Sequence, residues 1–415
     1  MSQSAFAETY QCRSCLHRDL HLIVDLGAQP LANSFLSREA LARMEPTYPL
    51  PLLYCSTCHL VQIPAATKPD AIFRDYLYMS SFSQTWLDHA RNFVDQVTQR
   101  FGLGPQSRVI EVASNDGYLL QFICRQGIPA LGIEPAANVA KLAVDKGVPT
   151  RVAFFGTATA RTLLAEGFTA DLVVANNVLA HAPDLNDFVG GFPLILNREG
   201  VATLEFPHLA SLIEQTQFDT IYHEHFSYFS LLAADALFSR HALRIFDVEK
   251  LPTHGGSLRL YLCRADAGHA KNPAVEALIA EEQEIGLDQA ATFRDFAGAC
   301  RKIKNDLLRF LIDAAEAGRV VCGYGAPAKG NTLLNFCGAR ADLIAFTVDR
   351  NPYKQNHFLP GTRIPILAPE AITTAKPDYV LILPWNLKTE ICEQMHHIRG
   401  WGAKFLVAVP ELSLF

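Results

Sequence analysis

Short apolar runs alternate with helical stretches twice along this chain, and this repeat constrains the fold more than any other feature. Apolar strands that alternate with helices are typical of parallel sheets covered on both faces. The sequence therefore predicts two doubly wound α/β units in tandem. The first has apolar runs at 107–112, 129–135, 170–176 and 200–207, and the second begins at 319–335 and ends with runs at 378–383 and 405–412.

Three segments between these runs complete the predicted architecture. Residues 243–251 and 256–265 favour an antiparallel strand pair that closes the first unit. Residues 274–317 favour a long, charged helical stretch between the two units.

Four of the ten cysteines form two CxxC pairs near the start of the chain. The pairs are Cys12/Cys15 and Cys55/Cys58. This spacing is typical of tetrahedral zinc, and four thiolates leave no open position for a substrate, so we expect a structural zinc site. Chance thiols or a redox pair are the alternative. The other six cysteines lie singly in apolar contexts and are expected in the cores.

The bulk composition narrows the class of protein. A length of 415 residues favours about two to three domains, because a single core stops growing near ~250–300 residues. A net charge of −6 argues against nucleic acid as the main partner. The first residues lack the pattern of a signal peptide, and no apolar run reaches the ~18 residues of a membrane span. We therefore expect a cytoplasmic protein.

The turn at 113–117 points to a cofactor site in the first unit. A strand, a tight turn and a helix form the usual entrance to a nucleotide-cofactor site at the carboxyl ends of parallel strands. The segment 113–115 stands where a G-x-G-x-x-G turn would have glycines, which disfavours a dinucleotide. These features, with an acidic strand end suited to a ribose, favour S-adenosylmethionine over a Rossmann half without that ligand. The predicted cofactor-binding residues are Glu111, Ala113, Ser114, Asn115, Asp116, Gly117, Glu134, Asn176 and Asn177.

A second turn of this kind opens the second unit. Gly323 and Gly325 lie between strand and helix, and Lys329 follows. Backbone N–H groups at a helix N-terminus beside a lysine suit a phosphate or diphosphate, although the turn is not a P-loop. A purely structural strand-to-helix turn is the alternative.

Together these motifs form a family pattern that covers essentially the whole chain. In order they are the two CxxC pairs, "YLYMSSFSQTW", "EVASNDGYLL", "NNVLAH", "IYHEHFSYFS", "HGGSLRLY" and "GYGAPAKGNTLLN". The chain resembles the S-adenosylmethionine-dependent nucleotide-sugar 3-C-methyltransferases that make branched deoxysugars of the tetronitrose and mycarose type.

The resemblance implies a fold and a reaction. It implies a zinc-binding domain (1–68), a class I methyltransferase domain with a Rossmann-like fold (69–275) and a second Rossmann-like domain (276–415). It also implies that a dTDP-linked 4-keto-deoxysugar lies between the last two domains and is methylated at C3. We expect a monomer or a weak oligomer that binds neither nucleic acid nor membrane.

Methylation of carbon requires a base and donors for the developing enolate oxygen. The segment "YHEH" supplies both, and histidine titrates in the right range for the first task. His225 is the predicted base, with Tyr222 as the alternative base or as donor to the C4 oxygen. Glu224 is predicted to orient a partner, to steady the imidazolium or to contact a substrate hydroxyl or amine, and His181 is predicted to help hold the enolate. His223 is expected to be a bystander. A metal held by His223, Glu224 and His225 is disfavoured, because spacing i, i+2 points to one face only in a strand and the helical H-E-x-x-H pattern is absent.

Ten further residues are predicted to contact the substrate. They come from the hydroxyl-rich segment 76–83, the glycine pair at 255–256 and the turn of the second unit. The alternatives to C-methylation are O- or N-methylation of a nucleotide sugar and, disfavoured by the missing glycines, a nicotinamide-dependent oxidoreductase. The predicted substrate-binding residues are Tyr76, Tyr78, Ser81, Ser83, His254, Ser257, Tyr324, Ala326, Lys329 and Asn331.

Overall fold

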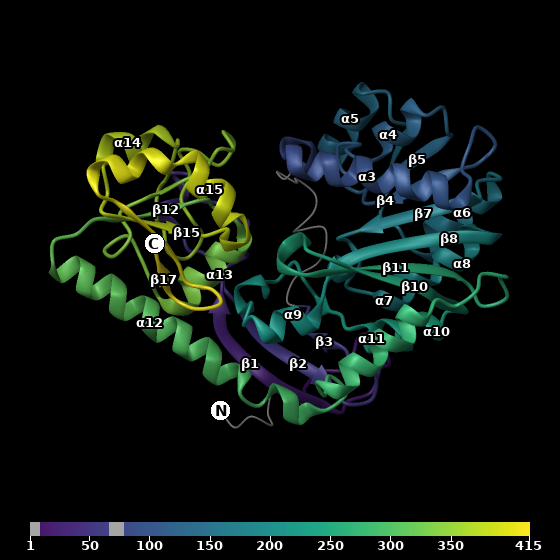
Figure 1. Ribbon diagram of the computed structural model, residues 1–415, viewed down its shortest axis with the longest axis horizontal. Helices are drawn as coiled ribbons and strands as arrows, with labels where there is room; N and C mark the ends of the chain where they lie inside the picture. The colour runs from purple at the N-terminus through teal and green to yellow at the C-terminus, as the bar shows by residue number, and fades with distance from the viewer. Residues whose placement is uncertain (1–8, 66–78) are drawn as a thin grey trace.

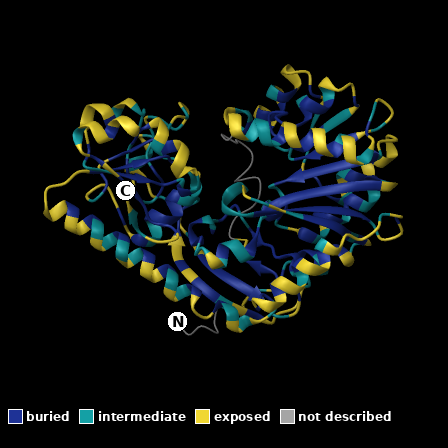
Figure 2. Ribbon diagram, viewed as in Figure 1, coloured by how far each residue is buried: buried dark blue, intermediate teal, exposed yellow. Residues whose placement is uncertain are grey.

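Three β-sheets organise the chain, and the computed structural model describes them over residues 9–65 and 79–415. In Figure 1 two α/β units lie side by side, and the purple N-terminal sheet runs beneath both. Figure 2 shows the strands as mostly buried and the outer helix faces as exposed. Among the described residues no helix is long and apolar enough to cross a membrane.

The first sheet is antiparallel and carries the cysteine pairs. Its order is β1 (Leu20–Gln29), β2 (Tyr48–Cys55), β3 (Val61–Gln62) and β9 (Ser227–Tyr228). Strand β9 comes from far along the chain and pairs with β3. The segment just before Ser227 is therefore attached to this cysteine-bearing sheet.

The second sheet has seven strands, and its parallel part matches the predicted first α/β unit. The two long strands at 243–251 and 257–264 pair antiparallel, as predicted. The strand order is β10 (Leu243–Leu251), β11 (Ser257–Arg264), β8 (Leu196–Pro207), β7 (Ala170–Asn176), β4 (Val109–Val112), β5 (Ala130–Glu134) and β6 (Thr150–Val152). Its main helices are α3 (Gln84–Phe101), α4 (Leu120–Arg125), α5 (Ala137–Asp145), α6 (Thr157–Ala165), α7 (Leu185–Gly190), α8 (Phe192–Ile195), α9 (Leu209–Glu214) and α10 (Leu231–Ser239).

Local sequence explains the long helix α3 that covers this sheet. Ala90, Phe93, Val94 and Val97 are its buried residues, spaced so that they form one face. Ser83 caps the start by accepting a hydrogen bond from the backbone N–H of residue 86, and the glycine after the helix adopts φ 61°. Cap and apolar face together define where this helix begins, ends and packs.

The third sheet forms the second α/β unit. Its order is β14 (Ile366–Leu367), β13 (Thr347–Val348), β12 (Val321–Tyr324), β15 (Tyr379–Ile382), β16 (Lys404–Val407) and β17 (Ser413–Leu414), parallel except for the last pair. Its helices are α13 (Ala328–Cys337), α14 (Glu370–Ala375) and α15 (Lys388–Gln394).

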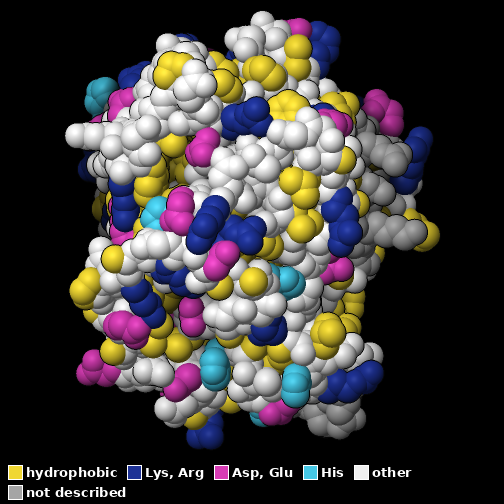
Figure 3. All heavy atoms as spheres, turned by 90° about the vertical axis from the view of Figure 1, so that its right-hand side faces the viewer, with side chains coloured by type: hydrophobic (Ala, Val, Ile, Leu, Met, Phe, Trp, Pro, Cys, Tyr) yellow, Lys and Arg dark blue, Asp and Glu magenta, His cyan; other side chains and the backbone are white. Residues whose placement is uncertain are grey.

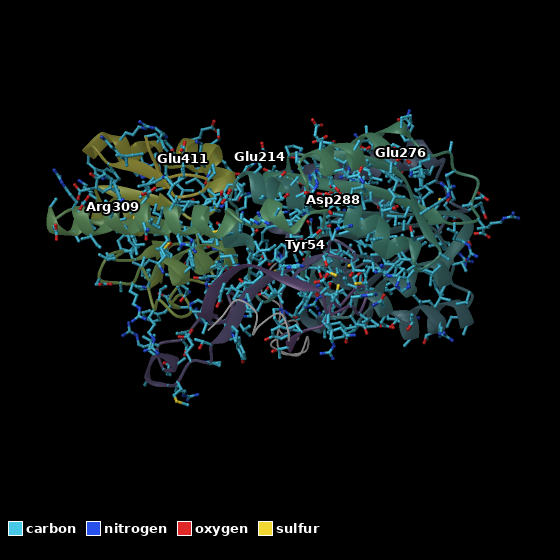
Figure 4. All side chains as sticks on the ribbon, turned by 90° about the horizontal axis from the view of Figure 1, so that it is seen from below. Tyr54, Glu214, Glu276, Asp288, Arg309 and Glu411 are labelled. Carbon is cyan, nitrogen blue, oxygen red and sulfur yellow. The ribbon has the colours of Figure 1, made fainter. Side chains whose placement is uncertain are left out.

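The helical stretch between the units is divided, where the sequence predicted one continuous stretch. It consists of α11 (Pro273–Glu284) and α12 (Phe296–Glu316), with a 3₁₀ turn, η6 (Ala290–Phe293), between them. Gly286 adopts φ 78° directly after α11 and ends it. In Figure 4 α12 lies on the left with Arg309, and α11 lies on the right with Glu276.

The cores join the first sheet to both α/β units. One apolar cluster contains Leu50 and Leu52 of β2 together with Leu307 and Leu311 of α12. Another contains Cys55 and Cys58 together with the core of the seven-stranded sheet. The cysteine-bearing sheet is therefore a platform shared by the two larger units. On the face shown in Figure 3, basic and acidic side chains are interspersed.

Candidate active site

A cavity of about 720 Å³ lies where the three sheets meet. Its lining comes from residues 31 and 33–35 between β1 and β2, from the carboxyl ends of strands in the seven-stranded sheet, from Tyr222, Glu224 and His225, and from 327–329 at the start of α13. In parallel α/β sheets this edge is where ligands bind. The predicted cofactor turn and the predicted catalytic segment therefore face one space.

The turn after β4 is shaped by positive backbone angles and by one acidic side chain. Ala113 and Asn115 have φ 57° and 50°. Glu134 accepts hydrogen bonds from the backbone N–H groups of Asn115 and Ala136, both at 2.9 Å. Burial raises the pKa of the Glu134 carboxyl. An acid at the end of β5 thus holds the turn in place while it also lines the cavity.

Five of the nine predicted cofactor-binding residues line the cavity, namely Ala113, Asn115, Glu134, Asn176 and Asn177. The Oδ1 atom of Asn176 is buried and has no hydrogen-bond partner among the described residues. A buried polar atom of this kind can accept a hydrogen bond from a ligand bound in the cavity. These residues fit S-adenosylmethionine, whose sulfonium supplies a transferable methyl group when it is bound.

The other four predicted cofactor residues lie behind the turn and not on the cavity lining. Glu111 is buried, burial raises its pKa, and it forms a hydrogen bond with Tyr118. Ser114 packs against the backbone of Gly132. Asp116 forms an ion pair with Lys146 at 3.0 Å. Gly117 has φ 75°. These four support the turn, and direct contact with the cofactor stays a prediction.

Tyr222 and His225 form a hydrogen-bonded pair in the cavity wall. The distance from Tyr222 Oη to His225 Nε2 is 2.8 Å, and His225 Nδ1 lies 3.0 Å from the carbonyl oxygen of Thr220. Because a carbonyl only accepts, Nδ1 carries the proton in the neutral ring. Nε2 therefore holds the free electron pair and accepts the hydrogen bond from the phenol.

The surroundings keep the His225 ring neutral. Burial lowers its pKa well below the usual value, and His181 lowers it further. The two rings meet edge to face, with centroids 4.7 Å apart. Burial also lowers the pKa of His181 to about 4. Near neutral pH this part of the cavity wall thus presents the uncharged imidazoles of His181 and His225 beside the Tyr222 phenol.

Glu224 and His223 point in different directions from this segment. Asn33 Nδ2 donates to both Glu224 carboxylate oxygens, at 2.7 and 2.9 Å. Burial raises the pKa of Glu224 to about 7, against the opposing effect of Asn33 and Lys354. His223 does not line the cavity, and its Nε2 lies 3.2 Å from the carbonyl oxygen of Pro49.

Two of the ten predicted substrate residues line the cavity. His254 adopts φ 57°, and its ring lies 5.3 Å from that of Trp86. Lys329 Nζ donates to Asn386 at 2.7 Å and lies over the Trp385 ring. Tyr76 and Tyr78 lie outside the described residues.

The other six are engaged within the protein and do not line the cavity, so their contact with substrate stays a prediction. Three of them act in the first unit: Ser81 bonds to Asp116, Ser83 caps α3 and Ser257 donates to the carbonyl of Thr253. Three act in the second: Tyr324 contacts Gln394, the Ala326 N–H donates to Asp349 and Asn331 donates to the carbonyl of Ala32.

The sequence reasoning missed Asn33, Trp86, Tyr118 and Lys354, all of which line the cavity. Asn33 lies in the insertion between the two CxxC pairs and has no motif around it. Lys354 follows β13, and its Nζ donates to the carbonyl of Ala326 at 2.9 Å. Trp86 and Tyr118 lie within the motifs "YLYMSSFSQTW" and "EVASNDGYLL", and Lys354 lies in the loop after a strand, so these three had a local signal that Asn33 lacks.

The four cysteines form a separate, closed metal site. Their sulfur atoms all lie within 4.8 Å of one another, with Cys12–Cys58 and Cys15–Cys55 each at 3.5 Å. A Zn–S bond of about 2.3 Å places tetrahedral sulfurs about 3.8 Å apart, so the donors fit zinc. Figure 4 shows a group of sulfur atoms to the right of Tyr54. In residues 9–65 and 79–415 these cysteines are the one His/Cys/Asp/Glu group with converging ligand atoms, which disfavours a metal at 223–225.

This fold and this cavity define an S-adenosylmethionine-dependent methyltransferase with an attached zinc-binding domain. Family models agree along the chain: a zinc binding domain matches residues 12–73, a methyltransferase domain residues 86–246 and a C-methyltransferase C-terminal domain residues 252–410. The C-methyltransferase NovU of Streptomyces niveus is 36% identical over 97% of this chain and 96% of its own length. The chain belongs to the S-adenosylmethionine-dependent C-methyltransferases.

Two solved methyltransferase structures each resemble part of the chain. Magnesium protoporphyrin IX methyltransferase from Synechocystis, with bound SAM, is 15% identical over 48% of this chain and 99% of that one, with a TM-score of 0.36. An S-adenosylmethionine-dependent methyltransferase from Clostridium acetobutylicum is 12% identical over 44% of this chain and 92% of that one, with a TM-score of 0.35.

Proposed function

We propose that this enzyme transfers the methyl group of S-adenosylmethionine to C3 of a dTDP-linked 4-keto-deoxysugar through an enolate. The observation that carries the proposal is the partly buried Tyr222–His225 hydrogen bond in the cavity that Glu134 and Asn176 also line. The C3 proton next to a ketone is acidic enough to be removed by a positioned base, whereas an ordinary C–H is not.

The hydrogen-bond pattern supports two routes for that proton. In the first, the Tyr222 hydroxyl turns to the C4 oxygen and His225 Nε2 takes the C3 proton directly. In the second, the Tyr222 oxygen takes the C3 proton and passes its own proton to His225 Nε2. In both routes Nε2 ends protonated, and the Thr220 carbonyl holds the Nδ1 side of the ring in place.

Glu224 is suited to the substituent at C3 or to a nearby hydroxyl. Its pKa of about 7 lets the carboxyl act as donor or acceptor near neutral pH. Asn33 fixes both oxygens, so the group presents a defined geometry to the cavity.

Two lysines support an anionic, nucleotide-linked substrate. Among the described residues that line the cavity, the basic Lys or Arg side chains are those of Lys329 and Lys354. Both lysines belong to the second α/β unit. A diphosphate between sugar and nucleoside supplies the matching negative charge. Burial lowers the pKa of both lysines, and nearby Asp219 and Asp349 oppose this effect for Lys329 and Lys354 respectively.

Deuterium exchange tests the proposal directly. The enzyme is incubated in D₂O with a panel of dTDP-4-keto-deoxysugars, and mass spectrometry follows deuterium at C3 and, after addition of S-adenosylmethionine, one added methyl group. Enolate chemistry predicts exchange at C3 that His225→Asn slows by about 10²–10⁴-fold and that His223→Asn, a control from the same segment off the cavity, leaves intact. Methyl transfer to oxygen or nitrogen without C3 exchange would refute it.

A further inference from the structure

The segment that leads into α3 is tied to the cofactor turn by a small polar cluster. This segment contains a 3₁₀ turn, η2 (Ser80–Phe82), directly before the α3 cap. The backbone N–H of Ser80 donates to Asn115 Oδ1 at 2.9 Å. The Ser81 hydroxyl donates to Asp116 Oδ2. Two consecutive residues of the turn thus hold two consecutive residues of η2.

Lys146 completes the cluster from the far end of α5. Its Nζ donates to Asp116 Oδ2 at 3.0 Å, to the Asp116 carbonyl at 3.1 Å and to Ser81 Oγ at 3.2 Å. The Asp116 side chain is 1% exposed and that of Lys146 is 40% exposed. Lys146 is the cation that balances this buried carboxylate, and it does so without lining the cavity.

The anchored segment forms part of the cavity wall beside the cofactor turn. Ser80 and Trp86 both line the cavity. The Trp86 ring stacks with Tyr118, which also lines the cavity, at a centroid distance of 6.1 Å. Displacement of η2 would therefore open one side of the space next to Ala113 and Asn115.

We propose that Lys146 is a positioning residue for cofactor binding. It holds Asp116 and Ser81 together and thereby keeps the wall from Ser80 to Trp86 closed against the S-adenosylmethionine site. The inference rests on the methyltransferase fold and not on the proposed sugar substrate, so binding experiments without any sugar test it.

Calorimetric titration with S-adenosylmethionine provides the first test. Lys146→Met is expected to raise the Kd about tenfold, because a buried carboxylate loses its cation beside the site. Lys146→Arg restores the charge and is expected to return the Kd to within about threefold of wild type. Lys141→Met is the matched control, since Lys141 pairs with Asp145 on the exposed side of the same helix, with side chains 73% and 55% exposed.

Hydrogen exchange followed by mass spectrometry separates positioning from general destabilisation. Faster exchange confined to peptides covering 79–86 and 113–118 in Lys146→Met supports the proposal. An unchanged Kd in Lys146→Met overturns it, and so does an unchanged Kd in Ser81→Ala if faster exchange spreads throughout the seven-stranded sheet of Lys146→Met. Ser81→Ala removes the same anchor without exposing a charge, so a raised Kd in this variant keeps the test valid if Lys146→Met folds poorly.

Discussion

Removal of the Tyr222 hydroxyl isolates the hydrogen-bonded pair on which the proposed chemistry depends. Tyr222→Phe deletes the 2.8 Å bond to His225 Nε2, while the ring keeps its place about the imidazole, with centroids 4.1 Å apart in the wild type. The buried nitrogen loses its partner, which we expect to cost about 1–3 kcal/mol in the free energy of unfolding. The protein should fold, so its rates remain measurable.

The expected rate effect is much larger than the effect on stability. A positioned general base contributes about 10²–10⁴-fold, so Tyr222→Phe and His225→Asn should each slow C3 deuterium exchange by that order. Groups that act as a unit show losses that do not multiply. The double variant should therefore be about as slow as the slower single variant.

The assay measures C3 exchange by mass spectrometry without S-adenosylmethionine, so methyl transfer does not mask proton removal. Because burial lowers the pKa of His225 well below 6.5, the base stays unprotonated between pH 7.5 and 6.5. Protonation of His225 should therefore not slow C3 exchange in this range. Losses that multiply in the double variant, or exchange within threefold of wild type in either single variant, would refute the reasoning.

Three further predictions concern the zinc site, the junction of the units and the cavity histidines. Cys55→Ser and Cys58→Ser should abolish the zinc that plasma mass spectrometry detects at one atom per chain, whereas Cys124→Ser should retain it. Trp385→Phe removes the 2.7 Å hydrogen bond from Nε1 to buried Asp219 and should lower the urea-derived free energy of unfolding by about 1–3 kcal/mol. Trp401→Phe, which loses a bond to the Pro377 carbonyl, is the control and should cost less. Burial lowers the pKa of His254 to about 4 in the folded protein. As pH falls from 6.5 to 4, the imidazole is therefore protonated in the unfolded chain but still neutral in the folded protein, and the free energy of unfolding decreases. His254→Gln should flatten that loss by on the order of 3 kcal/mol in urea titrations across this range.

Local patterns predicted the elements because their causes lie within a few residues. The period of apolar residues indicated strands of both α/β units, and CxxC spacing indicated the zinc ligands. The turn after β4 was recognised although it lacks the usual glycines, since a strand, a turn and a helix follow in order. The break in the long helical stretch also has a local cause, Gly286. The charged helical pattern on both sides of this glycine nevertheless favoured the prediction of a single stretch.

The roles of individual cofactor-turn residues needed the structure. Asn115 and Asp116 both belong to the predicted turn, but their side chains hold η2, and the ion pair with Lys146 joins residues 30 positions apart. A motif indicates that a turn faces a ligand, whereas the direction of each side chain depends on what packs around it.

The sequence by itself determined the class of this protein, through two α/β repeats, four spaced cysteines and a Tyr–His segment. Only the tertiary structure brought Asn33 to Glu224 across 191 positions and placed Lys354 in the same cavity. Turns, caps and strand periods arise from neighbouring residues, so one sequence reveals them. Contacts between distant segments depend on how whole sheets pack against one another. The residues around a side chain in a single sequence therefore do not indicate which distant residue it contacts.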